Sequence, residues 1–268
     1  MEDRGKGSLV LIHGRMPGGE DSLLEKRRGR ETVGRILIGI DLGGTNIKGA
    51  AMRVDGKVLR RVKIPTDNEH GGAPAVLDRM CKLVRRLVEE VGARDKDVYA
   101  VGVGAPGPLN SRTGVIVETP NLKWKNVRVV REMRRQTGMK VFLENDAISA
   151  AYGEYWKGAG KGAGCMIILT LGTGVGGGII INGEPLKGID DTAGHLGHVP
   201  VEIEGRKCSC GGTGCLEAYA SATGIVARTL DRLASSGEYP DSPLRRIAPE
   251  KLTAADVSAA ASGGCRLA

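Results

Sequence analysis

Hydrophobic residues form short runs along the chain, separated by glycine, threonine and charged residues. The first run that suits a strand buried on both faces is Arg35–Asp41, where the apolar pattern is continuous. Two more strands are predicted over Asn46–Arg53 and Lys57–Lys63. The dipeptide Asp55-Gly56 between them favours a hairpin turn. The three segments predict the beginning of a sheet.

A helical pattern follows in the segment APAVLDRMCKLVRRLVEEVG. Its apolar residues recur at intervals of three and four, which places them on one helical stripe. The stripe consists of Val76, Met80, Leu83, Val84, Leu87, Val88 and Val91. Further strands are predicted over Val98–Gly104 and Lys140–Leu143, and helices over Asn126–Thr137 and Ala147–Trp156. In the first of these helices, Val129, Val130 and Met133 are expected to face inward. Strands that alternate with helices predict the α/β fold class.

The plan of the first strands returns after Cys165. MIILTLGTGVGGGIIINGE repeats the order of LIGIDLGGTNIKGAAMRVDGK: an apolar strand, a Gly/Thr turn, a second strand and a hairpin signal. The hairpin signals are Asn182-Gly183 and Asp55-Gly56. Two unrelated β-hairpins would share part of this pattern, but the common Leu-Gly-x-Thr turn favours duplication. The repeat predicts two related α/β lobes.

We therefore expect an N-terminal lobe over residues 35–146 and a C-terminal lobe over residues 147–268. Residues 1–34 are polar and rich in glycine and arginine, so they are expected to be a flexible extension. Only 3% of the 268 residues are aromatic, which predicts an aliphatic core. No signal peptide is visible, and apolar runs such as Met166–Leu171 are too short to span a membrane. We expect a soluble, cytoplasmic protein with no membrane partner.

The net charge of +8 arises largely from residues 123–140, where seven lysines and arginines face one glutamate. This segment could be a nucleic-acid surface or the solvated face of a helix. A single aromatic residue, Trp124, stands among these charges, whereas binding of single-stranded nucleic acid would favour several aromatic residues that alternate with them. The solvated helix is the preferred interpretation, and a nucleic-acid partner is not expected.

Two glycine-rich turns are candidate phosphate sites. In the first, Asp41-Leu42-Gly43-Gly44-Thr45-Asn46, glycines allow backbone N–H groups to approach an anion, and Thr45 and Asn46 add side-chain donors. Asp41 could hold Mg²⁺ through water, and Lys48 could neutralise phosphate. The second turn contains Gly172, Thr173 and Gly174. The chain has neither the P-loop signature nor a dinucleotide-binding signature in the right context. Together the two turns predict a clamp for a polyphosphate group.

Glu144-Asn145-Asp146 follows an apolar strand and precedes a helix. A carboxylate there could cap the helix. It could equally act as the base that accepts a proton from a hydroxyl attacking phosphorus, because ligands bind at strand ends in open α/β sheets. The sequence leaves both roles open.

Three of the six cysteines lie in the segment CSCGGTGC, as Cys208, Cys210 and Cys215. His198 precedes them by ten residues, and one histidine with three cysteines is a common structural zinc set. Free thiols or a redox pair are the alternatives, but a close cluster in a reducing compartment favours zinc. The remaining cysteines, Cys81, Cys165 and Cys265, are expected to be free thiols.

Several segments together resemble the ROK family (repressors, open reading frames and sugar kinases), covering roughly residues 35–225 in the order that the family has. They are IGIDLGGTNIKGA, VGAPGPLN with TPNLKW, LENDAISAAYGE, LTLGTGVGGGIIINGE and GHLGHVPVEIEGRKCSCGGTGCLEAYAS. The resemblance implies two lobes like those of actin and hexokinase, which are ribonuclease H-like, with a cleft between them. It also implies a glucokinase-like sugar kinase that uses ATP and Mg²⁺, contains structural Zn²⁺ and forms a homodimer.

The resemblance assigns roles to individual residues. Asp146 matches the catalytic base, which activates the C6 hydroxyl of the sugar. Residues that match sugar-contacting positions are Gly107, Asn121, Asn145, His198 and Glu217. Residues that match the ATP-phosphate loops are Gly43, Gly44, Thr45, Thr173 and Gly174. His198 matches a residue that both binds zinc and contacts sugar.

The chain departs from the family pattern at two places. His195 stands where the family has a sugar-binding glutamate. The family also continues beyond the point that corresponds to Ala268, so the second lobe is expected to be incomplete and the chain poorly active and poorly soluble. A sugar-responsive transcriptional regulator and a non-catalytic sugar-binding fragment are the alternative functions. Residues 1–34 are too short for a helix-turn-helix domain, which favours the kinase. The sequence does not distinguish glucose from other hexoses or N-acetylhexosamines, nor ATP from polyphosphate.

Overall fold

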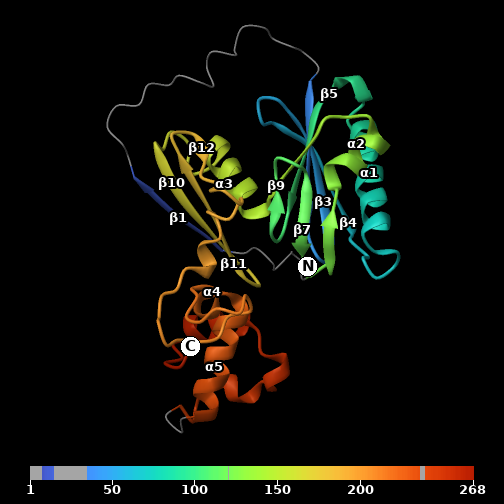
Figure 1. Ribbon diagram of the computed structural model, residues 1–268. Coiled ribbons are helices and arrows are strands. Elements are labelled where there is room, and N and C mark those ends of the chain that lie inside the picture. Colours follow the sequence, from blue (N-terminus) through green and yellow to red (C-terminus); the bar gives the residue numbers. More distant parts are fainter. Residues whose placement is uncertain (1–7, 15–34, 120, 236–238) are drawn as a thin grey trace. The chain divides into compact units, whose positions relative to one another are not determined.

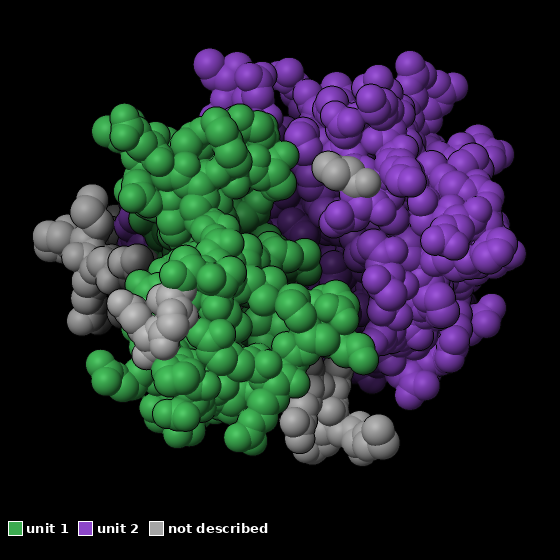
Figure 2. All heavy atoms as spheres, turned by 90° about the horizontal axis from the view of Figure 1, so that it is seen from below, with its two compact units in different colours: residues 1–12, 167–178, 194–268 green, residues 13–166, 179–193 purple. Residues whose placement is uncertain are grey.

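The computed structural model describes residues 8–14, 35–119, 121–235 and 239–268 (Figure 1). It has the α/β fold that the sequence predicts, with three sheets and helices among them. The chain divides into two compact units (Figure 2). The larger unit consists of His13–Met166 and Ile179–Ala193, and the smaller unit of Met1–Ile12, Ile167–Gly178 and Gly194–Ala268.

The larger unit is built on a five-stranded sheet of order β4-β3-β2-β5-β9. Its strands are β2 (Ile36–Leu42), β3 (Asn46–Arg53), β4 (Val58–Pro65), β5 (Val98–Ala105) and β9 (Val141–Asn145). The strands β2, β3 and β4 are antiparallel to one another, and β5 and β9 run parallel to β2. The carboxyl ends of β2, β5 and β9 therefore meet at one edge of the sheet.

Two helices, α1 (Gly72–Glu90) and α2 (Val129–Thr137), pack with one face of this sheet in a shared core. Burial alternates along β2, and every residue of the predicted stripe on α1 is buried except Val91, which is half-buried. The core is aliphatic, as its low aromatic content predicts, with methionines and Trp124 added. Within it, burial raises the pKa of the Cys81 thiol to about 11, so this thiol is unreactive near neutral pH.

A three-stranded antiparallel sheet in the same unit is not predicted by the sequence. It consists of β6 (Leu109–Asn110), β7 (Val115–Thr119) and β8 (Trp124–Val127). The helix expected over residues 126–137 consequently begins at Val129. Asn126 lies in β8 with φ 53°, a conformation that a helix does not allow.

The third sheet has the order β1-β10-β11-β12. Its strands are β1 (Ser8–Gly14), β10 (Cys165–Leu171), β11 (Val175–Ile181) and β12 (Glu184–Pro185). The strands β10 and β11 flank the second Gly/Thr turn, as the internal repeat predicts. The strand β1 lies within the segment expected to be a flexible extension, where Leu9–Ile12 forms an apolar run. The rest of that extension, residues 1–7 and 15–34, lies outside the described residues.

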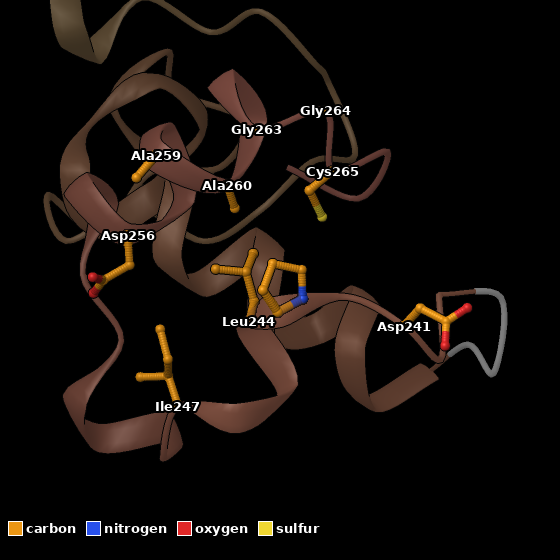
Figure 3. A pocket seen from close by; sticks show the side chains of 10 residues that line it. Asp241, Leu244, Ile247, Asp256, Ala259, Ala260, Gly263, Gly264 and Cys265 are labelled. Atoms are coloured by element: carbon orange, nitrogen blue, oxygen red, sulfur yellow. The ribbon is translucent and has the colours of Figure 1, made fainter.

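Helices follow in the smaller unit: α4 (Glu217–Ala220), α5 (Ala222–Ser235) and α6 (Ala254–Ser262). A pocket of about 570 Å³ is lined by Ala260 of α6, by Leu244 of the 3-10 helix Pro243–Arg246 and by Ile247, which follows that helix (Figure 3). None of the residues predicted to bind sugar, ATP or metal lines this pocket.

The helix α3 (Asp146–Lys157) belongs to the larger unit, whereas we expected it to open the C-terminal lobe. It packs against β5 and β9, and a Cβ added to Gly104 would lie 3.3 Å from Ser149 Oγ. Across the described part of the chain, every helix is too short or too polar to cross a membrane.

Candidate active site

The edge where β2, β5 and β9 end collects the predicted residues of the larger unit. Asp41 is paired in register with Gly104, which is also paired with Glu144, and Ala105 is paired with Asn145. The Gly43–Asn46 turn leaves the end of β2, and Asp146 follows the end of β9. Parallel strands end at the same edge, which is where ligands bind in open α/β sheets.

The first glycine-rich turn is a tight connection between β2 and β3. The Gly43 N–H donates to the Asn46 carbonyl at 3.1 Å, and a Cβ added to Gly43 would lie 2.7 Å from that oxygen. Thr66, a residue that the sequence analysis did not single out, braces the turn by donating its hydroxyl to the Gly43 carbonyl at 2.7 Å. Gly44 and Thr45 are exposed, so their backbone is accessible to a ligand.

Asp41 and Lys48, predicted to serve magnesium and phosphate, contact each other. They are directly opposite on β2 and β3, and their charged groups lie 3.3 Å apart. Both side chains are more than half exposed, so the pair is open to solvent and worth at most about 1 kcal/mol. An anionic ligand or a cation can therefore compete for either partner at little cost.

Gly107 and Asn121 lie near the edge where β2, β5 and β9 end. Gly107 has φ 85°, and a Cβ at this position would lie 2.3 Å from the Glu118 carbonyl oxygen, so the loop requires glycine. A Cβ added to Gly44 would lie 3.5 Å from the Asn121 Cβ, which places the exposed Asn121 beside the phosphate turn. The structure thus brings a predicted sugar residue next to a predicted phosphate residue.

Asn145 supplies the cap of α3. Its Oδ1 accepts the backbone N–H groups of Ala147 and Ile148 at 2.9 and 3.2 Å. Asp146 is the first helical residue, and one of its oxygens accepts the Ala147 N–H at 2.8 Å. The sequence left the cap and the base as equal roles for this carboxylate. Because Asn145 caps the helix through its amide oxygen, the Asp146 carboxylate is not required as the cap and can serve a ligand.

The pKa of the Asp146 carboxyl group is raised above its ordinary value. Burial is the largest cause, and the negative charge of Asp41 adds to it, while the Ala147 N–H acts in the opposite direction. The residue is nevertheless exposed at the sheet edge, so surrounding protein shields the carboxyl group without closing it off from a ligand. A carboxylate with a raised pKa is a stronger base than an ordinary aspartate.

The second glycine-rich turn lies in the smaller unit and is held by Glu217. The Gly172 N–H donates to the Gly174 carbonyl at 3.0 Å, and the Val175 N–H donates to Glu217 Oε2 at 2.9 Å. The other oxygen of Glu217 accepts the Ser209 hydroxyl at 3.1 Å. Glu217, predicted to bind sugar, therefore connects the turn to the cysteine segment. Its sugar role stays a prediction.

The four predicted metal ligands come together. The Nδ1 or Nε2 atom of His198 and the Sγ atoms of Cys208, Cys210 and Cys215 all lie within 4.8 Å of one another. The Sγ atoms of Cys210 and Cys215 are 3.7 Å apart, and Cys208 Sγ is 3.8 Å from His198 Nδ1. Tetrahedral zinc with Zn–S bonds of about 2.3 Å separates its sulfur ligands by roughly 3.8 Å. The donor set and its spacing fit zinc. The cysteines outside the cluster, Cys81, Cys165 and Cys265, are free thiols.

His195 lies beside this cluster, with its ring edge-to-face to that of His198 at 6.2 Å between centroids. It is half-buried, and burial lowers the pKa of its imidazole. The ring is therefore neutral near pH 7 and offers one acceptor nitrogen.

Sequence reasoning missed Ser111, Lys187 and Asp191, which lie near Asp146. It also missed that Glu144 binds the Lys187 ammonium group and the Asn145 N–H. Ser111, Glu144, Lys187 and Asp191 form one hydrogen-bonded cluster at the end of β9. Ser111 and Asp191 are 80 positions apart, and neither lies in a motif, so no signal in the chain identifies their contact.

The model of the ROK family matches residues 37–268. The chain belongs to the ROK family. Glucokinase from Halalkalibacterium halodurans is 41% identical over 232 residues, which cover 85% of this chain and 68% of that relative. Glucokinase from Thermotoga maritima is 41% identical over 240 residues, covering 87% and 71%. A solved ROK family glucokinase from Streptomyces griseus, in complex with glucose and AMPPNP, has a TM-score of 0.68 and 32% identity and covers 87% of this chain and 72% of that one.

Proposed function

We propose that this ROK family protein transfers the γ-phosphoryl group of ATP to glucose and forms glucose 6-phosphate. The observation that carries the proposal is the Asp146 carboxylate, which lies at the sheet edge beside the glycine-rich turn while Asn145 caps the helix. Two glucokinases with 41% identity, and a glucokinase structure that contains glucose and an ATP analogue, support the reaction and its substrates.

In the proposed reaction the C6 hydroxyl oxygen of glucose forms a bond to the γ-phosphorus. The bond between that phosphorus and the bridging oxygen breaks, ADP leaves, and the hydroxyl proton passes to Asp146. The raised pKa of Asp146 favours this transfer. The Asn145 NH₂ group would donate to a sugar hydroxyl, and the Gly44 and Thr45 backbone would approach the phosphates.

Two metal ions belong to the proposal. Asp41 would hold Mg²⁺ through water, since Mg²⁺ prefers oxygen ligands and Asp41 lies close enough to Asp146 to influence its charge. Bound Mg²⁺ would neutralise phosphate charge. His198, Cys208, Cys210 and Cys215 would hold a structural Zn²⁺, which would fix the segment between His198 and Glu217.

The remaining sugar contacts would come from Gly107, Asn121, His195, His198 and Glu217. By family resemblance we also infer a cytoplasmic location and a homodimer. The carboxylate at position 146 favours catalysis over a purely regulatory role, because a regulator has no need of a base beside the phosphate turn.

The test is a coupled assay of zinc-loaded protein with ATP and a panel of glucose, mannose, allose, N-acetylglucosamine and N-acetylmannosamine. We expect the highest kcat/KM for glucose. The same panel with polyphosphate determines the donor. Binding of sugar by calorimetry without any turnover would identify a sugar-binding fragment, and a sugar-dependent gel shift without turnover would identify a regulator. Either result would contradict the proposed function.

A further inference from the structure

Lys187 lies at the centre of a cluster that the mechanism above does not use. Its ammonium group donates to Ser111 Oγ at 3.0 Å and forms an ion pair with Glu144. Ser111 in turn donates its N–H and its hydroxyl to the two Asp191 oxygens at 2.9 and 3.3 Å. All four residues belong to the larger unit. The loop after β12 is thus hydrogen-bonded both to the β6–β7 connection and to the end of β9.

Glu144 links Lys187 to Asn145, the residue that precedes the proposed base Asp146. While one of its oxygens binds Lys187, the other accepts the Asn145 N–H at 3.0 Å. Asn145 is the residue that caps α3 and precedes Asp146. A short path of three contacts therefore runs from the Lys187 ammonium to the first turn of the helix that carries the proposed base.

The loop that carries Lys187 has a defined shape. The Ala193 N–H donates to the Lys187 carbonyl at 3.0 Å, which closes the loop on itself. Asp191 has φ 55°, a conformation that is uncommon for residues other than glycine and that persists only when neighbouring contacts hold it. Its two hydrogen bonds to Ser111 supply those contacts. The loop therefore presents Lys187 and Asp191 together.

The Lys187–Glu144 pair is more shielded from solvent than the Lys48–Asp41 pair. Its side chains are only 33% and 24% exposed, whereas those of Lys48 and Asp41 are 64% and 54% exposed. A partly desolvated pair is more sensitive to loss of one partner, because the remaining charge is left without compensation. Glu144 would then move toward solvent and release the Asn145 N–H.

We propose that Lys187 is a positioning residue for phosphoryl transfer, which fixes Glu144 and through it Asn145 and Asp146. The proposal rests on the proposed function, because it holds that the Lys187–Glu144 contact serves to place Asp146 as the base of that reaction. Misplacement of a reacting group by about 1 Å can cost on the order of 10²-fold in rate. Asp191 supports Lys187 by holding Ser111.

The test compares Lys187→Met, Glu144→Gln and the double variant with Lys161→Met, which changes an exposed lysine outside the cluster. We expect Lys187→Met to lower kcat by about 10- to 100-fold, with the KM for ATP unchanged. The double variant leaves no uncompensated charge, so its loss should be smaller than the product of the two single losses. It also provides a folded variant if Lys187→Met does not fold. Asp191→Asn, with Asp190→Asn as its control, should lower kcat less than Lys187→Met.

Hydrogen exchange supplies a readout that does not need activity. The Ala147 and Ile148 amides are held by Asn145, so Lys187→Met should speed their exchange while Lys161→Met leaves it unchanged. If the variants keep the wild-type kcat, or lose kcat while both amides exchange as in wild type, the proposal is overturned. If the wild-type protein phosphorylates no sugar, the proposed function fails, and the exchange of the two amides alone decides whether Lys187 positions the helix.

Discussion

At the strand ends of the larger unit, the parallel register of β2, β5 and β9 and a buried aliphatic core fix Asp41, Gly104 and Asn145. The cysteine loop of the smaller unit, residues 199–216, is held by hydrogen bonds of turns rather than by a sheet and a buried apolar core. Its strand-like pairing is limited, within the described residues, to the isolated bridges Pro200↔Cys215 and Lys207↔Thr213. Val201 and Ile203 in this loop are 57% and 92% exposed.

This difference shows that the two parts of the candidate site depend on different sources of order. Burial of aliphatic side chains stabilises the strand ends without a ligand. The cysteine loop buries few apolar residues, so under the proposed function its order would depend on the zinc ion, because metal binding contributes directly to the folding free energy of such segments. The predictions below test each part separately.

The largest effect is expected from Asp146→Asn at the strand ends. An amide cannot take the hydroxyl proton, so kcat should fall by about 10²–10⁴-fold. The folded-state pKa of Asp146 lies above its unfolded value, so its ionised form opposes folding at neutral pH. The variant should therefore be at least as stable as wild type. Glucose binding by calorimetry and thermal unfolding complete the measurement.

Asp95→Asn is the matched control for this prediction, since Asp95 is an exposed aspartate away from the strand ends. Wild-type turnover in Asp146→Asn would mean that the carboxylate only supports the helix.

A smaller effect is expected from His195→Glu. A carboxylate accepts hydrogen bonds from two hydroxyls, whereas the neutral imidazole has one acceptor nitrogen, and a charged hydrogen bond contributes about 1.5–3 kcal/mol. The KM for glucose should fall by roughly tenfold or more. His195→Gln, which keeps a single neutral acceptor, should leave it near the wild-type value. If the KM for glucose and the KM for N-acetylated hexosamines are each the same in wild type and in both variants, His195 does not contact the sugar.

The smallest effect concerns the titration of Asp146. Burial and the charge of Asp41 raise its pKa above the ordinary value of 3.8. The base works only when ionised, so activity should rise with pH through a midpoint above that value. Carboxyl titration by NMR should show the raised midpoint, and Asp41→Asn should move it toward lower pH. A midpoint that does not respond to Asp41→Asn would show that the two carboxylates do not interact.

The sequence predicts the parts of the fold whose periodicity is strong. The strand β2 and the apolar stripe on α1 are confirmed. The continuous apolar pattern predicted burial of β2 on both faces, whereas only alternate residues of β2 are fully buried. The strands β6, β7 and β8 are two, five and four residues long, which is too short to produce a clear period, so the sequence analysis missed them. Local rules also misplaced the start of α2, because tertiary pairing holds Asn126 in a strand.

The candidate site was predictable where it lies in compact motifs. The glycine turns, Asn145-Asp146 and the cysteine cluster each occupy a few consecutive positions. The ion pair between Lys187 and Glu144 joins residues 43 positions apart, and only the folded sheet brings them together. The same holds for the hydrogen bond from the Val175 N–H to Glu217, whose carboxylate the family resemblance assigns to sugar binding.

Hydrogen exchange with and without a zinc chelator tests the contrast between the two regions most directly. Removal of the metal should speed exchange across residues 199–216 by more than tenfold and leave the Ala147 and Ile148 amides unchanged. Cys215→Ser should reproduce the loop effect without chelator, and Cys165→Ser, outside the cluster, should not. If chelation leaves the exchange of residues 199–216 slow, the metal does not order the loop. If chelation also speeds the exchange of the Ala147 and Ile148 amides, the two regions are not ordered independently. Either result contradicts the account.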